Sequence, residues 1–143
     1  MKYEYSQELQ EKAEEISNAL FPHIKPNRIK CYKSYGTSSR RTIARCHALG
    51  KLMQKALDID AFYALEFITE RFDKLDEEGK IKVIIHELMH IPFTFGGGFK
   101  HHDVVNTRNV NKAYEIYKEF LNKNNPKELE RLENSPKDRW YNF

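Results

Sequence analysis

The sequence predicts an α+β fold in which a small sheet of three to four strands, mixed or antiparallel, packs on helices. Segments 28–35, 41–47 and 62–68 alternate apolar and polar residues, as half-buried strands do. Segments 6–20 and 76–90, and a third that begins at Val105 or Val110 and runs to Leu121, repeat apolar residues with a helical period. Because 143 residues fit one domain with a real core, we expect residues 1–143 to form a single domain.

The first half of the chain contains a capped helix and two strands. Ser6 is placed to cap the first helix. Strands 28–35 and 41–47 are separated by the turn-forming residues 36–39, so we expect the two strands to form a hairpin. Segment 49–57 is compatible with either a short helix or a strand.

The second half contains the clearest strand and the most buried helix. In segment 62–68, large apolar residues alternate with Ala64 and Glu66. Asp76 precedes a helix whose first turn is acidic, as the helix dipole favours, and Pro92 ends that helix. A short helix is expected at 126–133.

The C-terminal tail, 136–143, places three aromatic residues in a charged segment: Trp140, Tyr141 and Phe143. These aromatic side chains are expected to dock on the core or to cover a groove.

Composition excludes several classes of protein. Hydrophobic residues make up 40% and aromatic residues 13%, as in folded proteins. The net charge of +3, from 24 basic and 21 acidic residues, is too small to indicate nucleic-acid binding by itself. No apolar run reaches the roughly 18 residues that a membrane span requires, and no signal peptide is visible. We therefore expect a cytoplasmic protein in which Cys31 and Cys46 are free, buried thiols.

The motif His86-Glu87-Leu88-Met89-His90 carries the clearest chemistry. On a helix, residues four apart share a face, so His86 and His90 can direct two imidazole nitrogens at one ion. Neutral imidazoles suit Zn²⁺, and Glu87 is close enough to act as the general base on a zinc-bound water. The surrounding apolar residues would make two histidines and a glutamate costly to bury without a partner.

A catalytic zinc needs a third protein ligand. A histidine six residues after the second would indicate a metzincin, but that position is Gly96. His101 and His102 follow the glycine run 96–98, and Glu115 or Glu119 could instead act as a glutamate ligand. The adjacent histidines are the better candidates, with one of them binding the metal.

The runs 83–92 and 95–102 resemble a family of metallopeptidases from archaea and phages. Its members carry H-E-L-x-H-I-P, then a glycine-containing loop, then a histidine after a short basic stretch. Segments 44–57 and 62–75 also resemble the family, so the similarity covers most of positions 28–110. It implies that His102 is the third ligand, with His101 as the alternative. Relatives often have proline where His101 stands.

The resemblance also implies a fold and a reaction. The family is similar to SprT-like and other small gluzincin-like proteases. This implies a zincin-like peptidase domain in which the motif helix lies beside an edge strand, with a catalytic core at about 28–122 and a tail at 123–143. The implied reaction is zinc-dependent hydrolysis of a peptide or protein substrate. Strand 62–68 is the expected edge, along which substrate would bind by strand addition, and the alternative is that it is a central strand paired on both sides.

Several further residues have two interpretations. Asp103 could orient a ligand histidine or cap the following helix. Candidates for stabilising the oxyanion are Arg45, Arg108, Tyr114 and Tyr117. His23 is expected in an exposed loop, and His47 in the core or a strand.

Two alternative functions remain at this point. A fourth protein ligand would make the zinc structural and the protein a non-catalytic binding or regulatory module. By analogy with SprT-like proteins, the basic residues Arg40, Arg41, Arg45 and Lys51 could instead contact DNA.

Overall fold

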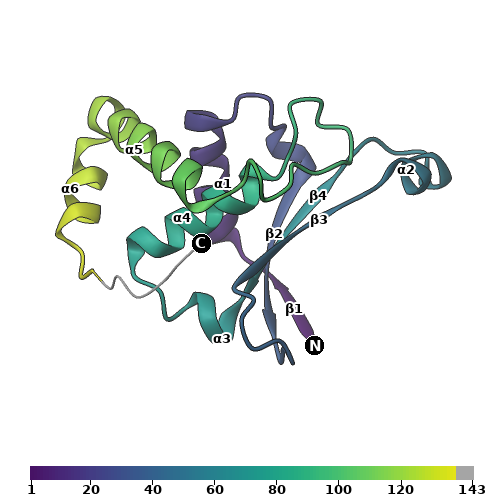
Figure 1. Cartoon of the computed structure of the whole chain (residues 1–143), viewed down its shortest axis with the longest axis horizontal. Helices are drawn as coiled ribbons and strands as arrows, with labels where there is room; N and C mark the ends of the chain where they lie inside the picture. Colours follow the sequence, from purple (N-terminus) through teal and green to yellow (C-terminus); the bar gives the residue numbers. More distant parts are fainter. Residues whose placement is uncertain (138–143) are drawn as a thin grey trace.

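A four-stranded mixed sheet carries helices on one of its faces in the computed structural model, which describes residues 1–137 (Figure 1). The strands are β1 (Lys2–Tyr5), β2 (Ile29–Tyr35), β3 (Ala44–Ala48) and β4 (Tyr63–Ile68), and their order in the sheet is β1-β2-β4-β3. β2 and β4 run parallel, whereas β1 pairs antiparallel with β2 and β3 antiparallel with β4. The predicted α+β class is confirmed.

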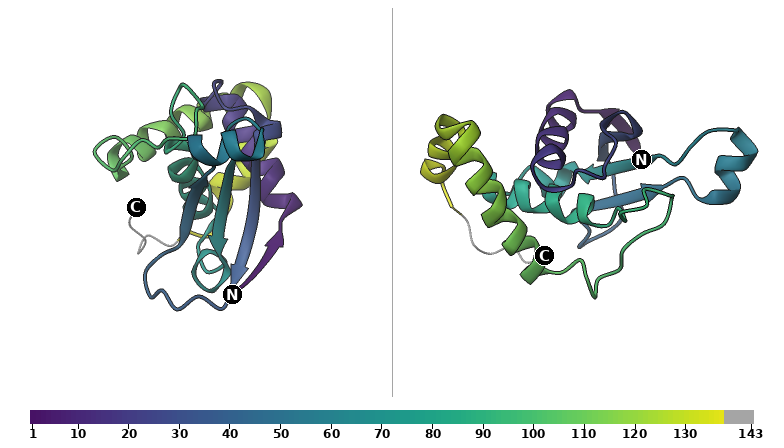
Figure 2. Two further views of the ribbon diagram at one scale, coloured as in Figure 1. Left: turned by 90° about the vertical axis from the view of Figure 1, so that its right-hand side faces the viewer. Right: turned by 90° about the horizontal axis from the view of Figure 1, so that it is seen from above.

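The helices form the second layer. They are α1 (Gln7–Leu20), α2 (Lys51–Leu57), α3 (Thr69–Phe72), α4 (Glu77–Met89), α5 (Thr107–Asn124) and α6 (Pro126–Asn134), with a 3-10 turn at Pro26–Arg28. α1 packs on β2 and α4 on β3, while α5 packs on both α1 and α4. The sequence left open whether segment 49–57 is a helix or a strand, and residues 51–57 form the helix α2. This helix projects from the end of the sheet (Figure 2).

β4 forms the centre of the core. Its inward-facing side chains, Tyr63, Leu65 and Phe67, are each 0% exposed, and they pack in one apolar cluster with Ile84 and Leu88 of α4. Burying side chains of this size contributes about 1.5–3 kcal/mol each. The alternation in 62–68 therefore correctly groups Tyr63, Leu65 and Phe67 on one buried face, although Glu66 and Ile68 on the other face are buried as well.

The predicted hairpin between 28–35 and 41–47 is wrong. β4 lies between β2 and β3, so those two strands are not paired with each other. A turn-forming sequence between two strands does not exclude the insertion of a later strand, and the apolar surface of β4 is best buried when strands flank it on both sides. The same arrangement makes β3 an edge of the sheet, and β4 is not the edge that the sequence predicts.

β1 is a strand that the sequence pattern does not reveal. Its four residues are all exposed, so none of them contributes a core-facing apolar signal. Ser6, which follows β1, caps α1 as predicted, its hydroxyl accepting from the Leu9 amide at 3.2 Å.

No helix within residues 1–137 is long and apolar enough to span a membrane. The predictions about Trp140, Tyr141 and Phe143 concern residues that lie outside the described part of the chain.

The strand order predicts a pattern of amide hydrogen exchange. We expect the amides of Tyr63–Ile68 to exchange more slowly than those of any other strand, because β4 alone is paired on both sides along its whole length. Residue-resolved exchange measured by NMR checks this. A β2–β3 hairpin with β4 at the edge would instead leave alternate amides of β4 exchanging rapidly.

Candidate metal centre

α4 places the motif residues between the sheet and α5. Asp76 caps the helix by accepting from the Gly79 amide at 2.7 Å. The helix ends at Met89, one residue before His90, which occupies the C-cap position. His86 and His90 thus project from successive turns at the buried C-terminal end of α4.

Three histidines converge at this end of α4. Ring centroids are 5.1 Å apart for His86 and His90, 5.0 Å for His90 and His102, and 5.6 Å for His86 and His102. One ring nitrogen from each lies within 4.8 Å of the other two. Three imidazole donors at this spacing could hold one divalent transition-metal ion, as imidazole-rich sites commonly do.

The His90 ring is held in one orientation by the loop that follows α4. Its Nδ1 lies 2.6 Å from the Lys100 carbonyl oxygen, an acceptor, so Nδ1 carries the proton. Nε2 is then left with its lone pair free for an ion. In the other direction, the Lys100 amide donates to the His90 carbonyl at 2.7 Å.

The glycine run in the same loop is tied to the sheet and to α2. The Tyr63 hydroxyl donates to the Gly98 carbonyl and accepts from the Gly97 amide, both at 2.9 Å. The Gln54 side-chain amide donates to the Gly96 carbonyl at 3.0 Å. Gly97 has φ +100°, and a Cβ there would lie 2.4 Å from the Gln54 amide nitrogen, so this position requires glycine. These contacts fix the loop that ends at His102.

Glu87 is a buried carboxyl group beside the histidines. The residue is 6% exposed, and Oε2 lies 3.9 Å from Nε2 of His86. Burial raises the pKa of Glu87 to about 8, so the carboxyl group is largely protonated at neutral pH when no cation is near. A dication close by would favour the carboxylate, the form that can accept a proton.

His86 is held in its neutral form. Burial, together with the nearby His90 and His102, lowers the pKa of His86 to about 4. Its Nδ1 is buried and has no hydrogen-bond partner among the described residues. A buried polar atom without a hydrogen-bond partner costs free energy. An ion or a ligand bound at this site would explain why the atom is tolerated. Burial also lowers the pKa of His90, although its bond to the Lys100 carbonyl opposes this shift.

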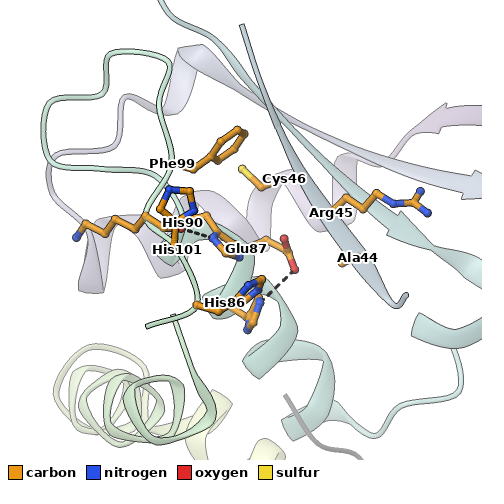
Figure 3. A pocket seen from close by; sticks show the side chains of 10 residues that line it. Ala44, Arg45, Cys46, His86, Glu87, His90, Phe99 and His101 are labelled. Atoms are coloured by element: carbon orange, nitrogen blue, oxygen red, sulfur yellow. Dashed lines mark hydrogen bonds and ion pairs between the residues drawn. The ribbon is translucent and has the colours of Figure 1, made fainter. Parts of the chain in front are cut away.

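A pocket of about 310 Å³ opens over the histidines and Glu87. Its opposite wall is β3, from which Ala44 and Cys46 contribute small side chains, and Phe99 closes one end (Figure 3). Cys46 is a free thiol, as expected, and burial raises its pKa, so it is not a reactive thiolate. The cluster therefore faces a space that a substrate can enter.

The structure separates the two candidate histidines of the loop. Both are exposed and line the pocket, but only His102 joins the cluster with His86 and His90 among the described residues. Asp103 is exposed and does not cap α5, because Asn106 does so by accepting from the Asn109 amide at 2.9 Å.

Other candidates from the sequence lie away from the cluster. Glu115 and Glu119 are exposed on α5, and Glu115 pairs with Lys118 at 3.2 Å. His23 is half-buried and not in an exposed loop as expected, because its ring nitrogen bonds to the Ile91 carbonyl at 3.0 Å. His47 lies in a strand, as predicted, and bonds to Glu66 at 2.8 Å.

The proposed oxyanion stabilisers are also engaged elsewhere or exposed. Arg45 points away from the histidines and pairs with Glu66 at 3.2 Å (Figure 3). Tyr117 donates to Glu15 of α1, and Tyr114 is buried in the core. Arg108 is exposed on α5.

Sequence reasoning missed the groups that position the loop. Tyr63, Gln54 and the Lys100 carbonyl contact the glycine run or His90, but none of them belongs to the motif. The alternation in 62–68 places the Tyr63 side chain on the buried face of its strand. This could have indicated a contact, because a buried tyrosine hydroxyl requires a hydrogen-bond partner. Nothing in the pattern around Gln54 or Lys100 distinguishes them from surface residues.

The buried Glu87 predicts a pH effect on the metal-free protein. Its raised pKa favours the folded state below pH 4.5, and this contribution is lost as the pH rises towards 8. Between pH 4.5 and 6.5 His86 acts in the opposite sense, because only its unfolded form binds a proton there. We therefore expect the free energy of unfolding to fall by about 2 kcal/mol between pH 6.5 and 8.

Urea unfolding in the presence of a chelator measures this change, and Glu87→Gln is the matched control. The glutamine cannot ionise, so the variant should lose most of the decrease above pH 6.5. An equal decrease in both proteins would assign the pH effect to other groups.

Comparison with known proteins bears directly on this site. The model of a family described as putative phage metallopeptidase matches residues 1–135, which include both the motif on α4 and His102. Searches of curated proteins and of solved structures found no match. Family membership suggests a hydrolase. By the extent of this match and by the histidine cluster within it, the chain belongs to the putative phage metallopeptidase family.

Proposed function

We propose that this protein is a zinc-dependent peptidase in which His86, His90 and His102 bind the metal and Glu87 is the general base. The observation that carries the proposal is the meeting of three imidazole donors, within 4.8 Å of one another, with a buried carboxyl group in an open pocket. Three protein ligands leave a position for water, as catalytic zinc sites require.

The reaction follows from these groups. When bound, a zinc ion would supply a water with a pKa of about 7 and would polarise the scissile carbonyl. Glu87 would then accept the proton of the attacking water and deliver it to the leaving amine. His90 keeps Nε2 available because the Lys100 carbonyl holds the proton on Nδ1. The Lys100 carbonyl thus orients a ligand histidine, the role that the sequence suggested for Asp103. That role of Asp103 stays a prediction.

β3 supplies the substrate groove. Ile43 and Leu49 bond to β4 at the two ends of β3, so by the two-residue alternation of an antiparallel pair Ala44 and Cys46 direct their backbone groups to the free edge. An extended peptide can add to this edge by strand addition. The side chains of Ala44 and Cys46 face the metal pocket and are small, which leaves room for a substrate.

The alternatives have less support. Among residues 1–137 the candidate donor group contains three histidines and no fourth ligand that would close the coordination sphere. Arg45, one of the basic residues considered for DNA binding, pairs with Glu66 at 3.2 Å, so its charge is already partly neutralised. Three further statements remain proposals. They are kinship with gluzincin-like or SprT-like proteases, the single domain with its core at 28–122, and cytoplasmic location.

Metal content tests the ligand assignment. We expect His102→Ala to lower zinc affinity by two orders of magnitude or more, because it removes one of three donors, while His101→Ala keeps affinity within a fewfold of wild type. Competition with a chromophoric chelator measures both. Equal zinc affinity in the two variants and wild type would reject His102 as a ligand and reopen the case for a glutamate.

Peptide hydrolysis by Glu87→Gln tests the reaction. The variant should bind zinc with its affinity nearly unchanged, yet lose at least about a hundredfold in kcat/KM, because a glutamine cannot accept the proton. A quenched fluorescent peptide library provides the substrate, and zinc content is measured on the same samples. A variant as active as wild type would exclude Glu87 as the base, and a zinc-loaded wild type without activity would favour the non-catalytic module.

A further inference from the structure

A second cavity lies directly beside the metal pocket. It measures about 200 Å³ and shares Ala44, His86 and Glu87 with that pocket. Because the two cavities meet at Glu87, a peptide lying along β3 with its scissile bond over the histidines would place a flanking residue in the second cavity. The volume is that of a site for one side chain, not for an extended segment.

Besides His86 and Glu87, the lining of this second cavity contains apolar side chains and one cation. Ile43 and Val83 provide apolar surface, and Thr42 borders them. Arg41 is the lining residue with a permanent positive charge, and its side chain is exposed. Among the described residues, no carboxylate forms an ion pair with Arg41. A guanidinium group in this setting is suited to a carboxylate, which it can bind through two parallel hydrogen bonds.

The loop that carries Arg41 is held rigidly by α3. Arg71 donates to the Arg40 carbonyl at 2.8 Å and to the Thr42 carbonyl at 3.1 Å, so the backbone is fixed on both sides of Arg41. Arg71 also donates to the Ser39 carbonyl. The hydroxyl of Ser39 in turn bonds to that of Thr42 at 2.9 Å. A loop that is already ordered loses little conformational entropy when it binds a ligand.

The start of the same loop is anchored by the neighbouring residue of α3. The Glu70 carboxylate accepts from the Gly36 amide at 2.8 Å, and this bond lowers the pKa of Glu70. Glu70 and Arg71 together hold the two ends of the loop, although neither lines the cavity. Arg41 is thus presented from a fixed backbone towards a cavity that adjoins the metal pocket.

We infer that this cavity is a specificity subsite for a carboxylate-bearing residue that flanks the scissile bond, with Arg41 as the group that binds the carboxylate. The inference rests on the proposed peptidase function. The carboxylate has two sources, an aspartate or glutamate side chain within a peptide, or the C-terminal carboxylate of the substrate. The first makes the protein an acid-selective endopeptidase, and the second makes it a carboxypeptidase.

Cleavage profiling of a synthetic random decapeptide library tests the subsite. The library is supplied in free-acid and C-terminally amidated forms to zinc-loaded wild type, Arg41→Ala, Arg41→Glu and Arg40→Glu, and the products are sequenced by mass spectrometry. Arg40→Glu is the matched control, since Arg40 is an exposed neighbour that does not line the cavity. Circular dichroism verifies that each variant is folded.

We expect wild type to prefer aspartate or glutamate over their amides at one position flanking the cleaved bond by about tenfold or more, as a charge-assisted pair would give. Arg41→Ala should lose the preference, Arg41→Glu should replace it with one for lysine or arginine, and Arg40→Glu should keep it. Cleavage near the C-terminus that disappears on amidation would identify the terminal carboxylate as the ligand. Unchanged preferences in Arg41→Glu would overturn the subsite.

A binding measurement separates this inference from the proposed function. Immobilised, zinc-loaded Glu87→Gln and the double variant Glu87→Gln/Arg41→Glu are exposed to the same library, and the retained peptides are sequenced. Retention of acidic peptides that depends on Arg41 would support the subsite even if wild type cleaves nothing, an outcome that rejects the peptidase alone. Cleavage without Arg41-dependent selection would reject the subsite alone.

Discussion

The reciprocal hydrogen bonds between His90 and Lys100 are the contact on which the site depends. They join the end of α4 to a loop that leaves the helix and returns, and His102 follows only two residues later. Closing such a loop costs conformational entropy, which the Tyr63 and Gln54 contacts to the glycine run offset. One contact thus sets the orientation of His90 and the approach of His102 together.

The polar residues of α4 conflict with their surroundings when no cation is present. Burial holds Glu87 protonated and His86 neutral, and it leaves a His86 ring nitrogen without a partner among the described residues. In an ordinary core this arrangement would only reduce stability. Where a dication is bound, the same burial strengthens the attraction between the ion and the carboxylate, because little water screens it. The burial that lowers stability in the metal-free protein is thus the same burial that would strengthen binding of the ion.

The order of the strands links the fold to the substrate. Because β4 separates β2 from β3, β3 keeps one edge that no strand within residues 1–137 pairs with, and that edge runs past the histidines. The loop between β2 and β3 must then pass the end of β4, where α3 holds it beside Glu87. The open edge beside the metal pocket and the cavity at Arg41 therefore follow from one topological feature.

The sequence by itself determined the local parts of this protein. Periodicity predicted α1, α4 and the buried face of β4, because each depends on the spacing of neighbouring apolar residues. The same spacing put His86, Glu87 and His90 on consecutive turns of one helix. Only the tertiary structure decided the strand order, the edge role of β3 and the presence of His102 but not His101 in the cluster. These depend on contacts between distant residues, such as Tyr63 with Gly97 or Arg71 with Thr42, which leave no periodic signal in the chain.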